Sequence, residues 1–362
     1  MRFVDLPISS FQRELESSLL RFGAKRRTNA LRARYNLGSS FRWNDGLVWR
    51  LPLALAALVA TALPAKAQDF PRRTNLDMTV LFAAGASADV TARLLAQGMT
   101  RELSANVIVV NRPGAGGAIG YKYVAGRNPD GYAMVWNSNS VSTAYHSGQM
   151  AIDYRAFEPV ARVLVETPLI AVRGVAKWKT FKELVADMKA QPGKITVGNS
   201  GIGSHTHITS ATLFKSAGVD VNDIPYAAGQ VVPALLGGHV DVLVLLPAAI
   251  AGQLKSGAVR VLTAVSAQRD SLLPDVPTAQ ELGFSVALDA WRGVAVPKGT
   301  PKNAIAILEK AIRQTVQSAE FQGGAERVYV KPAFMPASEF GALIAKEDAE
   351  LAKLMQSIGL KK

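Results

Sequence analysis

The sequence predicts an α/β fold of two lobes, each with a parallel sheet covered by helices on both faces. From residue 78 onward, short apolar runs alternate with longer amphipathic runs, and the alternation restarts near residue 169 after a stretch interrupted by Pro and Gly. The chain has 362 residues, which is enough for two hydrophobic cores. It has no cysteine and is 49% hydrophobic, which excludes a disulfide-stapled and a disordered protein.

Residues 1–67 are predicted to direct export and to lie outside the fold. Leu51–Leu63 is an uncharged, mostly apolar run that follows Arg50, and Ala65-Lys66-Ala67 fits signal-peptide cleavage after Ala67. The competing interpretation is a membrane anchor, but a membrane span needs about 20 apolar residues. Because a lipoprotein requires a Cys after the cleavage site, we expect a mature chain that is free in the periplasm.

The formal net charge of +13 is concentrated in this export segment. Residues 1–67 hold 11 Lys or Arg and 4 Asp or Glu, whereas the rest of the chain holds 30 and 24. Residues 1–46 are too long and too polar for the basic start of a signal peptide, so we expect translation to begin near Leu47 or Val48. The alternative is a nucleic-acid-binding arm, while the mature chain is not expected to bind nucleic acid.

The pattern places the elements in order along two lobes. In the first lobe it predicts strands at Met78–Phe82, Val107–Val110 and Tyr132–Trp136, and helices at Asp89–Leu103 and Ile119–Ala125. In the second it predicts strands at Leu169–Val172, Ile195–Val197 and Val240–Leu246, and helices at Phe181–Lys189 and His205–Ser216; two further helices follow at Ala304–Ser318 and Ser338–Met355. We expect residues 68–168 and 290–362 to form one lobe and residues 169–289 the other, joined by crossover strands with a ligand cleft between them.

Two of the predicted strand-to-helix loops have the composition of an anion site. Phe82–Asp89 and Val197–His205 are rich in small residues and contain no Lys or Arg. A helix start presents unpaired N–H groups and a partial positive charge, and small residues let a ligand approach the backbone. Facing each other across a cleft, the two loops would hold the two ends of a small diacid. For the first loop alone, an ordinary turn with Ser87 or Asp89 as the helix N-cap is the simpler interpretation.

A third loop, Asn111–Gly120, is rich in glycine but does not fit a nucleotide site. The third glycine of a dinucleotide fingerprint falls on Ile119, and the sequence has no Walker Gly-Lys-Ser/Thr. We therefore expect no phosphate cofactor, and interpret the loop as a turn packed between the lobes. Arg112 would then lie in a surface ion pair or near the cleft.

Residues suited to catalysis or metal binding are scarce. Gly198–Ile202 ends in Ile where a nucleophile elbow requires Gly, and the chain has no cysteine. A hydrolase that uses Ser200 or Ser204 therefore lacks a credible base. His205 and His207 are two residues apart, so a helix would point them to different faces, and we expect no metal site, no cofactor and no enzyme activity.

Several motifs, in order along nearly all of the mature chain, resemble those of one receptor family. They are Phe82–Arg93, Asn111–Gly117, Pro129–Tyr132, Ser200–His205, Pro225-Tyr226, Leu236–Asp241, Leu273–Thr278, and Trp291 with Pro297–Pro301. Through these motifs the chain closely resembles the Bug, or TctC-like, periplasmic solute-binding receptors of tripartite tricarboxylate transporters.

The resemblance implies a bilobed periplasmic-binding-protein fold that closes on a small organic anion, commonly a di- or tricarboxylate, an amino acid or an aromatic acid. In that family, backbone amides, hydroxyls and bridging waters of the first loop and its counterpart in the second lobe hold the near carboxylate. Carried over to this sequence, the positions are Phe82, Ala84, Gly85, Ser87, Ala88, Asp89, Ser200, Gly203 and Ser204. The partners would be membrane permease subunits, and we expect the receptor to be a monomer.

Further polar candidates follow other predicted strands. They are Asn137, Ser138 and Asn139, then Glu166 and Thr167 near the crossover, and Tyr226 and Asp289. Asp89 or Asp289 would meet a ligand ammonium if the solute is an amino acid, although helix capping explains Asp89 equally well. The alternative function is a periplasmic sensor whose closed form docks on a two-component signalling protein.

Overall fold

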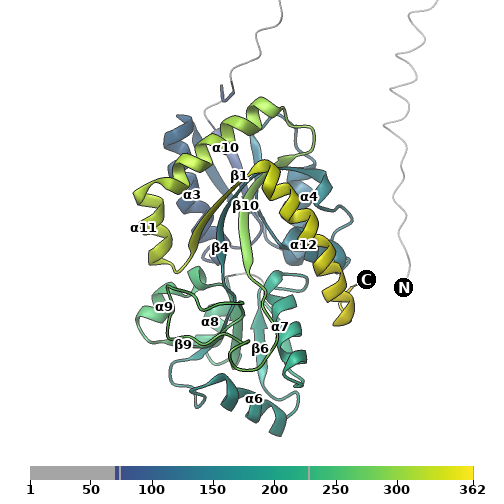
Figure 1. Ribbon diagram of the computed structural model, residues 1–362, viewed down its shortest axis with the longest axis vertical. Helices are drawn as coiled ribbons and strands as arrows, with labels where there is room; N and C mark the ends of the chain where they lie inside the picture. The colour runs from purple at the N-terminus through teal and green to yellow at the C-terminus, as the bar shows by residue number, and fades with distance from the viewer. Residues whose placement is uncertain (1–69, 73–74, 227–228, 362) are drawn as a thin grey trace, which may run out of the picture. The chain divides into compact units, whose positions relative to one another are not determined.

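The computed structural model describes residues 70–72, 75–226 and 229–361, which form two lobes, each built on one sheet (Figure 1). The predicted export segment lies outside the described residues. The strands of lobe 1 are β1 (Asn75–Val80), β2 (Asn106–Asn111), β3 (Ala133–Ser138), β4 (Phe157–Glu166), β10 (Ala290–Pro297) and β11 (Lys331–Pro336). Its helices are α3 (Ser87–Leu103), η1 (Ala115–Gly117), α4 (Ala118–Ala125), α5 (Ser140–His146), η2 (Tyr154–Ala156), α10 (Lys302–Gln317), α11 (Ala319–Arg327) and α12 (Ala337–Ser357).

Lobe 2 follows the crossover from β4. Its strands are β5 (Leu169–Arg173), β6 (Thr196–Asn199), β7 (Asn222–Pro225), β8 (Val242–Leu245) and β9 (Val259–Ala264). Its helices are α6 (Phe181–Ala190), α7 (His205–Ser216), α8 (Val231–Leu236), η3 (Pro247–Ala249) and α9 (Ala251–Lys255). Every strand and helix predicted from the sequence is present, with its ends shifted by no more than a few residues. None of the helices in the described part of the chain is long and apolar enough to span a membrane.

Both sheets are mixed, so the prediction of parallel sheets is wrong. The strand order is β11-β4-β10-β3-β1-β2 in lobe 1 and β7-β6-β8-β5-β9 in lobe 2. Only β2-β1-β3 and β7-β6-β8 are parallel, and the remaining pairs are antiparallel. The cause is the path of the chain, which crosses between the lobes from β4 to β5 and from β9 to β10. Strands that enter a sheet from the other lobe need no crossover helix, so they can pair antiparallel.

Helix α3 illustrates how the apolar pattern positions the elements around the site. Ala88, Ala92, Leu95 and Met99 recur at helical spacing and are buried on one side of the helix. They belong to the same buried cluster as Val80, from the strand that precedes the helix. The packing of this face therefore fixes where the start of α3 lies relative to the sheet.

The lobes are joined where the chain crosses between them, and they also contact each other elsewhere. The chain leaves β4 through Thr167 and Pro168, and Pro168 O accepts a hydrogen bond at 2.8 Å from Val265 N on the returning segment. Across the lobes, Thr143 Oγ1 donates to Gly203 O at 2.6 Å. Two connections and direct contacts therefore bring the ends of the strands of both lobes together.

Candidate ligand-binding site

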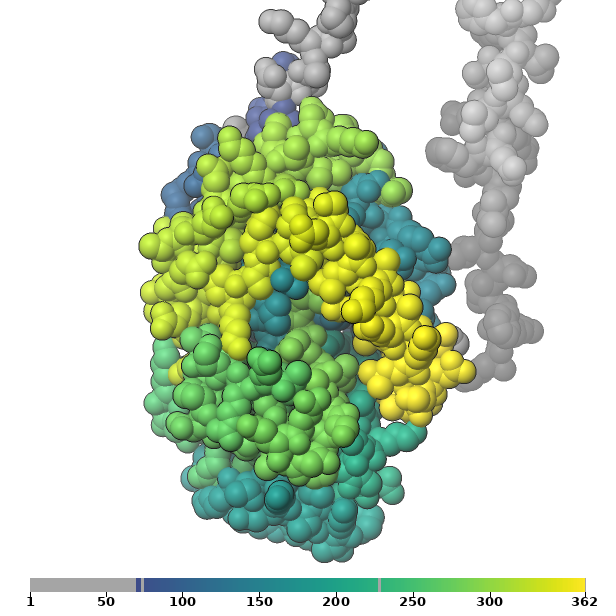
Figure 2. Space-filling model, in the orientation of Figure 1, coloured from purple at the N-terminus to yellow at the C-terminus, as the bar shows by residue number. Residues whose placement is uncertain are grey.

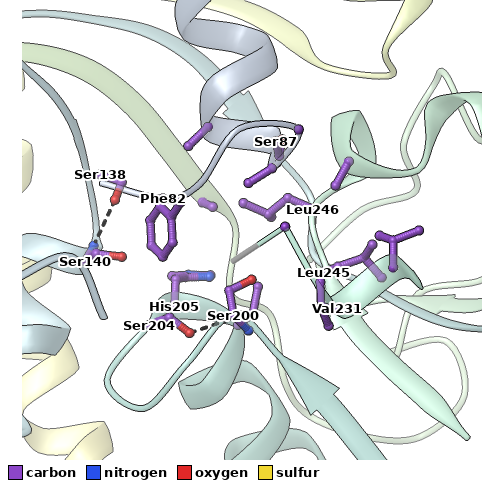
Figure 3. A pocket seen from close by; sticks show the side chains of 18 of the residues that line it. Phe82, Ser87, Ser138, Ser140, Ser200, Ser204, His205, Val231, Leu245 and Leu246 are labelled. Carbon is purple, nitrogen blue, oxygen red and sulfur yellow. Dashed lines mark hydrogen bonds between the residues drawn. The ribbon is translucent and has the colours of Figure 1, made fainter. Parts of the chain in front are cut away.

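A cavity of about 240 Å³ lies between the two lobes (Figure 3). The start of α3 reaches it from lobe 1 and the start of α7 from lobe 2. Its polar or glycine lining consists of Gly85, Ser87, Ser138, Ser140, Ser200, Ser204, His205, Thr206, Gly229, Gln253 and Arg292. Its apolar lining consists of Phe82, Ala86, Ala88, Val231, Val232, Pro233, Leu236, Leu245, Leu246, Ala249 and Ala290.

The start of α3 presents free backbone donors to this cavity. Gly85 has a φ of +82°, which glycine adopts with little strain, and its N–H donates to Asp89 Oδ2 at 3.0 Å. No described residue accepts a hydrogen bond from the backbone N–H of Ser87 or Ala88, and both residues line the cavity. The free N–H groups and the helix dipole favour an anion at this point.

The start of α7 presents a matching pair of donors from the other lobe. Ser204 is the N-cap, and its Oγ accepts from His207 N at 3.2 Å. Ser200 N donates to Thr206 Oγ1 at 3.0 Å, which holds the loop against the first turn of the helix. Within the described residues, the backbone N–H groups of His205 and Thr206 have no acceptor. An anion in the cavity can therefore be met by a helix start from each lobe.

Arg292 is the one Lys or Arg among the described residues that line the cavity. It is only 4% exposed, and its Nε donates to Glu166 Oε2 at 3.0 Å. The hydroxyl of Ser87 donates to the other oxygen of the same carboxylate. This buried network connects β10, the end of β4 and the start of α3 where the chain crosses between the lobes.

His205 lines both this cavity and a second one beside it. Burial lowers the pKa of His205 to about 4, and the positive charge of Arg292 acts in the same direction. His205 is therefore neutral at pH 7. Its Nδ1 lies 3.4 Å from Thr209 Oγ1, and no hydrogen bond within the described residues joins it to Ser200 or Ser204.

The second cavity, of about 460 Å³, lies where α12 approaches residues 285–289 (Figure 2, α12 in yellow). Glu347 Oε2 lies there and accepts from Trp291 Nε1 at 2.6 Å and from Asn139 Nδ2 at 2.8 Å. Burial raises the pKa of Glu347 and of Asp289, which also lines this cavity. Carboxylates along its wall make the second cavity a poor site for an anion, whereas the first has none.

The structure brings seven of the sixteen residues proposed from the sequence to the first cavity. These are Phe82, Gly85, Ser87, Ala88, Ser138, Ser200 and Ser204. The others do not line it: Ala84, Asp89, Asn137, Asn139, Glu166, Thr167, Gly203, Tyr226 and Asp289. The loops at the two helix starts therefore supply most of the predicted lining.

Several of the residues outside the cavity have protein partners instead. The Asp89 carboxylate accepts from Gly85 N, Arg93 Nε and Asn111 Nδ2, at 2.9–3.0 Å. Burial acts to raise the pKa of Asp89, but these hydrogen bonds outweigh it and lower the pKa. Asn137 Oδ1 accepts from Tyr121 Oη at 2.7 Å. Asp89 and Asn137 thus support the loops that line the cavity.

Thr167, Asp289 and Tyr226 lie near the cavity rather than in its lining. Thr167 Oγ1 donates to Asp289 Oδ1 at 3.2 Å beside the junction of the lobes. Tyr226 lines a neighbouring groove together with Phe82 and Ser200. Gly203 O accepts the hydrogen bond from Thr143 described above.

Sequence reasoning missed Arg292 and the apolar wall of the cavity. Arg292 follows Trp291 in a strand, and nothing local shows that it is buried against Glu166, 126 residues earlier. The apolar wall comes from α8 and the end of β8, whose Val231 and Leu245 look like ordinary core residues in the sequence. The sequence places His205 at the end of the second loop, but nothing in its pattern indicates that this residue lines the cavity.

The third loop packs between the lobes, as predicted. Gly116 has a φ of +62°, and a Cβ added to it would lie 2.7 Å from Ile202 O of lobe 2. The expected ion pair of Arg112 is wrong, because its guanidinium lies 3.5 Å above the ring of Tyr123 and pairs with no carboxylate of a described residue. Arg112 does not line the cavity, although Pro113 beside it lines the neighbouring groove with Ser200.

Two α/β lobes with a cavity between them, lined by a helix start from each lobe, are typical of a solute-binding protein. The family model described as "Tripartite tricarboxylate transporter family receptor" matches residues 91–360, and the chain belongs to this family. Members of this family are periplasmic solute-binding receptors rather than enzymes.

Individual proteins of this kind are similar to the chain in sequence and in structure. Protein BugT of Bordetella pertussis is 31% identical over 321 residues, covering 86% of this chain and 98% of BugT. The structure of the periplasmic binding protein BugD superposes with a TM-score of 0.77 at 31% identity, covering 81% of this chain and 100% of BugD. MatC from Rhodopseudomonas palustris with bound malate gives a TM-score of 0.74 at 25% identity, covering 79% of this chain and 99% of MatC.

Proposed function

We propose that the mature protein captures a small organic carboxylate in the cavity between its lobes and delivers it to membrane permease subunits of a tripartite tricarboxylate transporter. One observation carries the proposal: four residues with free backbone N–H groups, at two helix starts on opposite lobes, line one cavity. A carboxylate has enough lone pairs to accept from both starts. The malate bound by MatC supports this ligand class.

The same geometry supports transport by closure of the lobes. A ligand that contacts both helix starts makes all of its contacts only when the lobes are together, so binding favours the closed state. A permease that recognises the closed state would receive the loaded receptor in preference to the empty one.

We infer that the cavity binds its solute without catalysing a reaction. Ser200 and Ser204 are the candidate nucleophiles. The Ser204 hydroxyl lies 3.1 Å from Thr206 Oγ1 and accepts from His207 N–H at 3.2 Å, and the Ser200 hydroxyl has no hydrogen bond to a described residue. A serine nucleophile needs a base within hydrogen-bond reach. His207 Nδ1 instead accepts from Gly203 N at 3.3 Å.

We further propose that the protein acts in the periplasm after removal of residues 1–67. The support is the apolar run Leu51–Leu63 followed by small residues at Ala65 and Ala67. N-terminal sequencing of the protein recovered from a periplasmic extract should begin at Gln68. Recovery of the chain only from the cytoplasm, with residues 1–67 intact, would contradict export.

Calorimetry tests the binding function directly. The protein is purified from cells that express the full chain and titrated with a panel of mono-, di- and tricarboxylates and amino acids. At least one carboxylate should bind with a dissociation constant in the micromolar range or below. Absence of binding across the whole panel at millimolar concentrations would overturn the proposed function.

A further inference from the structure

The lining of the cavity is more polar on one side than on the other. Figure 3 shows Ser138, Ser140 and His205 on one side, with Phe82 among them, and Val231, Leu245 and Leu246 on the other, below Ser87. A wall of aliphatic side chains thus lies opposite most of the labelled polar side chains. A ligand that fills the cavity is therefore expected to have a polar part and an apolar part.

The charged groups at the cavity limit the charged groups of that ligand. Among the described lining residues, Arg292 is the single Lys or Arg, and there is no Asp or Glu. Glu166, which does not line the cavity, already pairs with Arg292, so Arg292 can bind one ligand carboxylate through its unused N–H groups, but an ammonium group would have no carboxylate partner in the lining. A second carboxylate would lie against Val231, Leu245 and Leu246, where a charge loses its hydration without gaining a partner.

The two Nη atoms of Arg292 carry N–H groups that are available to a ligand. Its Nε is used by Glu166, and no described residue accepts a hydrogen bond from either Nη atom, although the side chain is only 5% exposed. A buried guanidinium with unused N–H groups is suited to the two oxygens of a carboxylate, which it binds through parallel hydrogen bonds. Glu166 holds the guanidinium in place for this contact.

The volume of the cavity limits the apolar part of the ligand. A cavity of about 150 Å³ is enough to hold benzene. The cavity here is about 240 Å³. It therefore has room for a six-membered ring, or a branched chain of that size, together with one carboxylate.

We propose that the ligand is a monocarboxylate with an apolar, ring-sized body, that Arg292 holds its carboxylate through the N–H groups that Glu166 leaves unused, and that the cavity selects against diacids and amino acids. This inference rests on the proposed function, because it names the class of carboxylate that the same cavity accepts. Ser87 and the start of α7 complete the carboxylate site, and the aliphatic wall covers the body of the ligand.

Three probes test the inference on the unaltered protein: 3-phenylpropionate, its amide, and the diacid adipate. In calorimetry, 3-phenylpropionate should bind at least about tenfold more tightly than either of the others. If adipate binds as tightly as 3-phenylpropionate or more tightly, the inference is overturned while the proposed function stands. Equal affinity for acid and amide would overturn the role of Arg292. If no carboxylate of any kind binds, the proposed function and the inference both fall.

A double variant tests Arg292 without leaving a buried charge unpaired. Arg292→Gln together with Glu166→Gln removes the guanidinium donors and both charges of the pair, and should reduce the preference for acid over amide several-fold, leaving the part that the helix starts supply. The control is Arg101→Gln with Glu320→Gln, which removes an exposed pair of lobe 1 and should keep the preference. The ratio is diagnostic because a structural defect would weaken acid and amide alike. A double variant that folds and retains the full preference of the unaltered protein would overturn the inference.

Discussion

The buried imidazole of His205 makes the folded protein less stable in acid. In the folded protein its pKa is lowered to about 4 by burial and by Arg292, from 6.5 for an ordinary histidine. Above about pH 6.5 both folded and unfolded states hold a neutral imidazole. As the pH falls toward 4, the unfolded state takes up a proton that the folded state does not, so the free energy of unfolding decreases. At about 1.36 kcal/mol per pH unit, the loss reaches about 3 kcal/mol at pH 4.

The variant His205→Gln removes the titrating imidazole, so comparison with the wild type isolates its effect on the free energy of unfolding. Urea unfolding, followed by tryptophan fluorescence, gives the free energy of unfolding at pH 7 and at pH 4.5. Over that interval the wild type should lose about 2 kcal/mol more than the variant. Asp289 and Glu347 act in the opposite sense, because burial raises their pKa, but they titrate in both proteins and cancel in the comparison. Equal losses in the wild type and the variant would refute a buried, neutral His205.

Two further pairs of variants test the packing and the helix starts. Gly98→Ala should lower the free energy of unfolding by about 1–3 kcal/mol, because its Cβ would lie 2.2 Å from Thr315 Cγ2. Gly252→Ala, where no atom lies within 4 Å, should raise it by up to about 1 kcal/mol, and urea unfolding that ranks the two variants the other way would contradict the packing. Ser204→Ala and Thr180→Ala each remove an N-cap hydrogen bond and should each cost about 1 kcal/mol of stability in the same assay. Only Ser204→Ala should also weaken carboxylate binding in calorimetry, so an equal loss of affinity in both would show that α7 has no special role.

The elements of the fold could be predicted because their signals are local. Helices such as α3 and α7 are encoded by apolar spacing and by the residues at their starts, within a few residues of each other. Strand direction is different, because it depends on where the chain goes between strands. The apolar run of β5 looks the same in a parallel or an antiparallel sheet, and its pairing with β8 follows from the crossover at Thr167 and Pro168.

In the candidate site, too, residues with local signals could be predicted and residues placed by long-range contacts could not. Ser87 and Ser204 could be proposed because each lies at a predicted helix start in a loop without bulky residues. Arg292 could not, since its burial depends on Glu166 from a different strand. Leu245 and Val231 could not be separated from core residues, because apolar side chains that line a cavity and those that fill a core have the same pattern in the sequence.

A crystal structure with the tightest-binding carboxylate of the panel tests the central claim most directly. We predict that the carboxylate lies in the cavity between the lobes, within hydrogen-bond distance of the backbone N–H groups of Ser87 or Ala88 and of His205 or Thr206. A ligand in the second cavity beside Glu347, or outside both cavities, would contradict the claim that the two helix starts form the binding site.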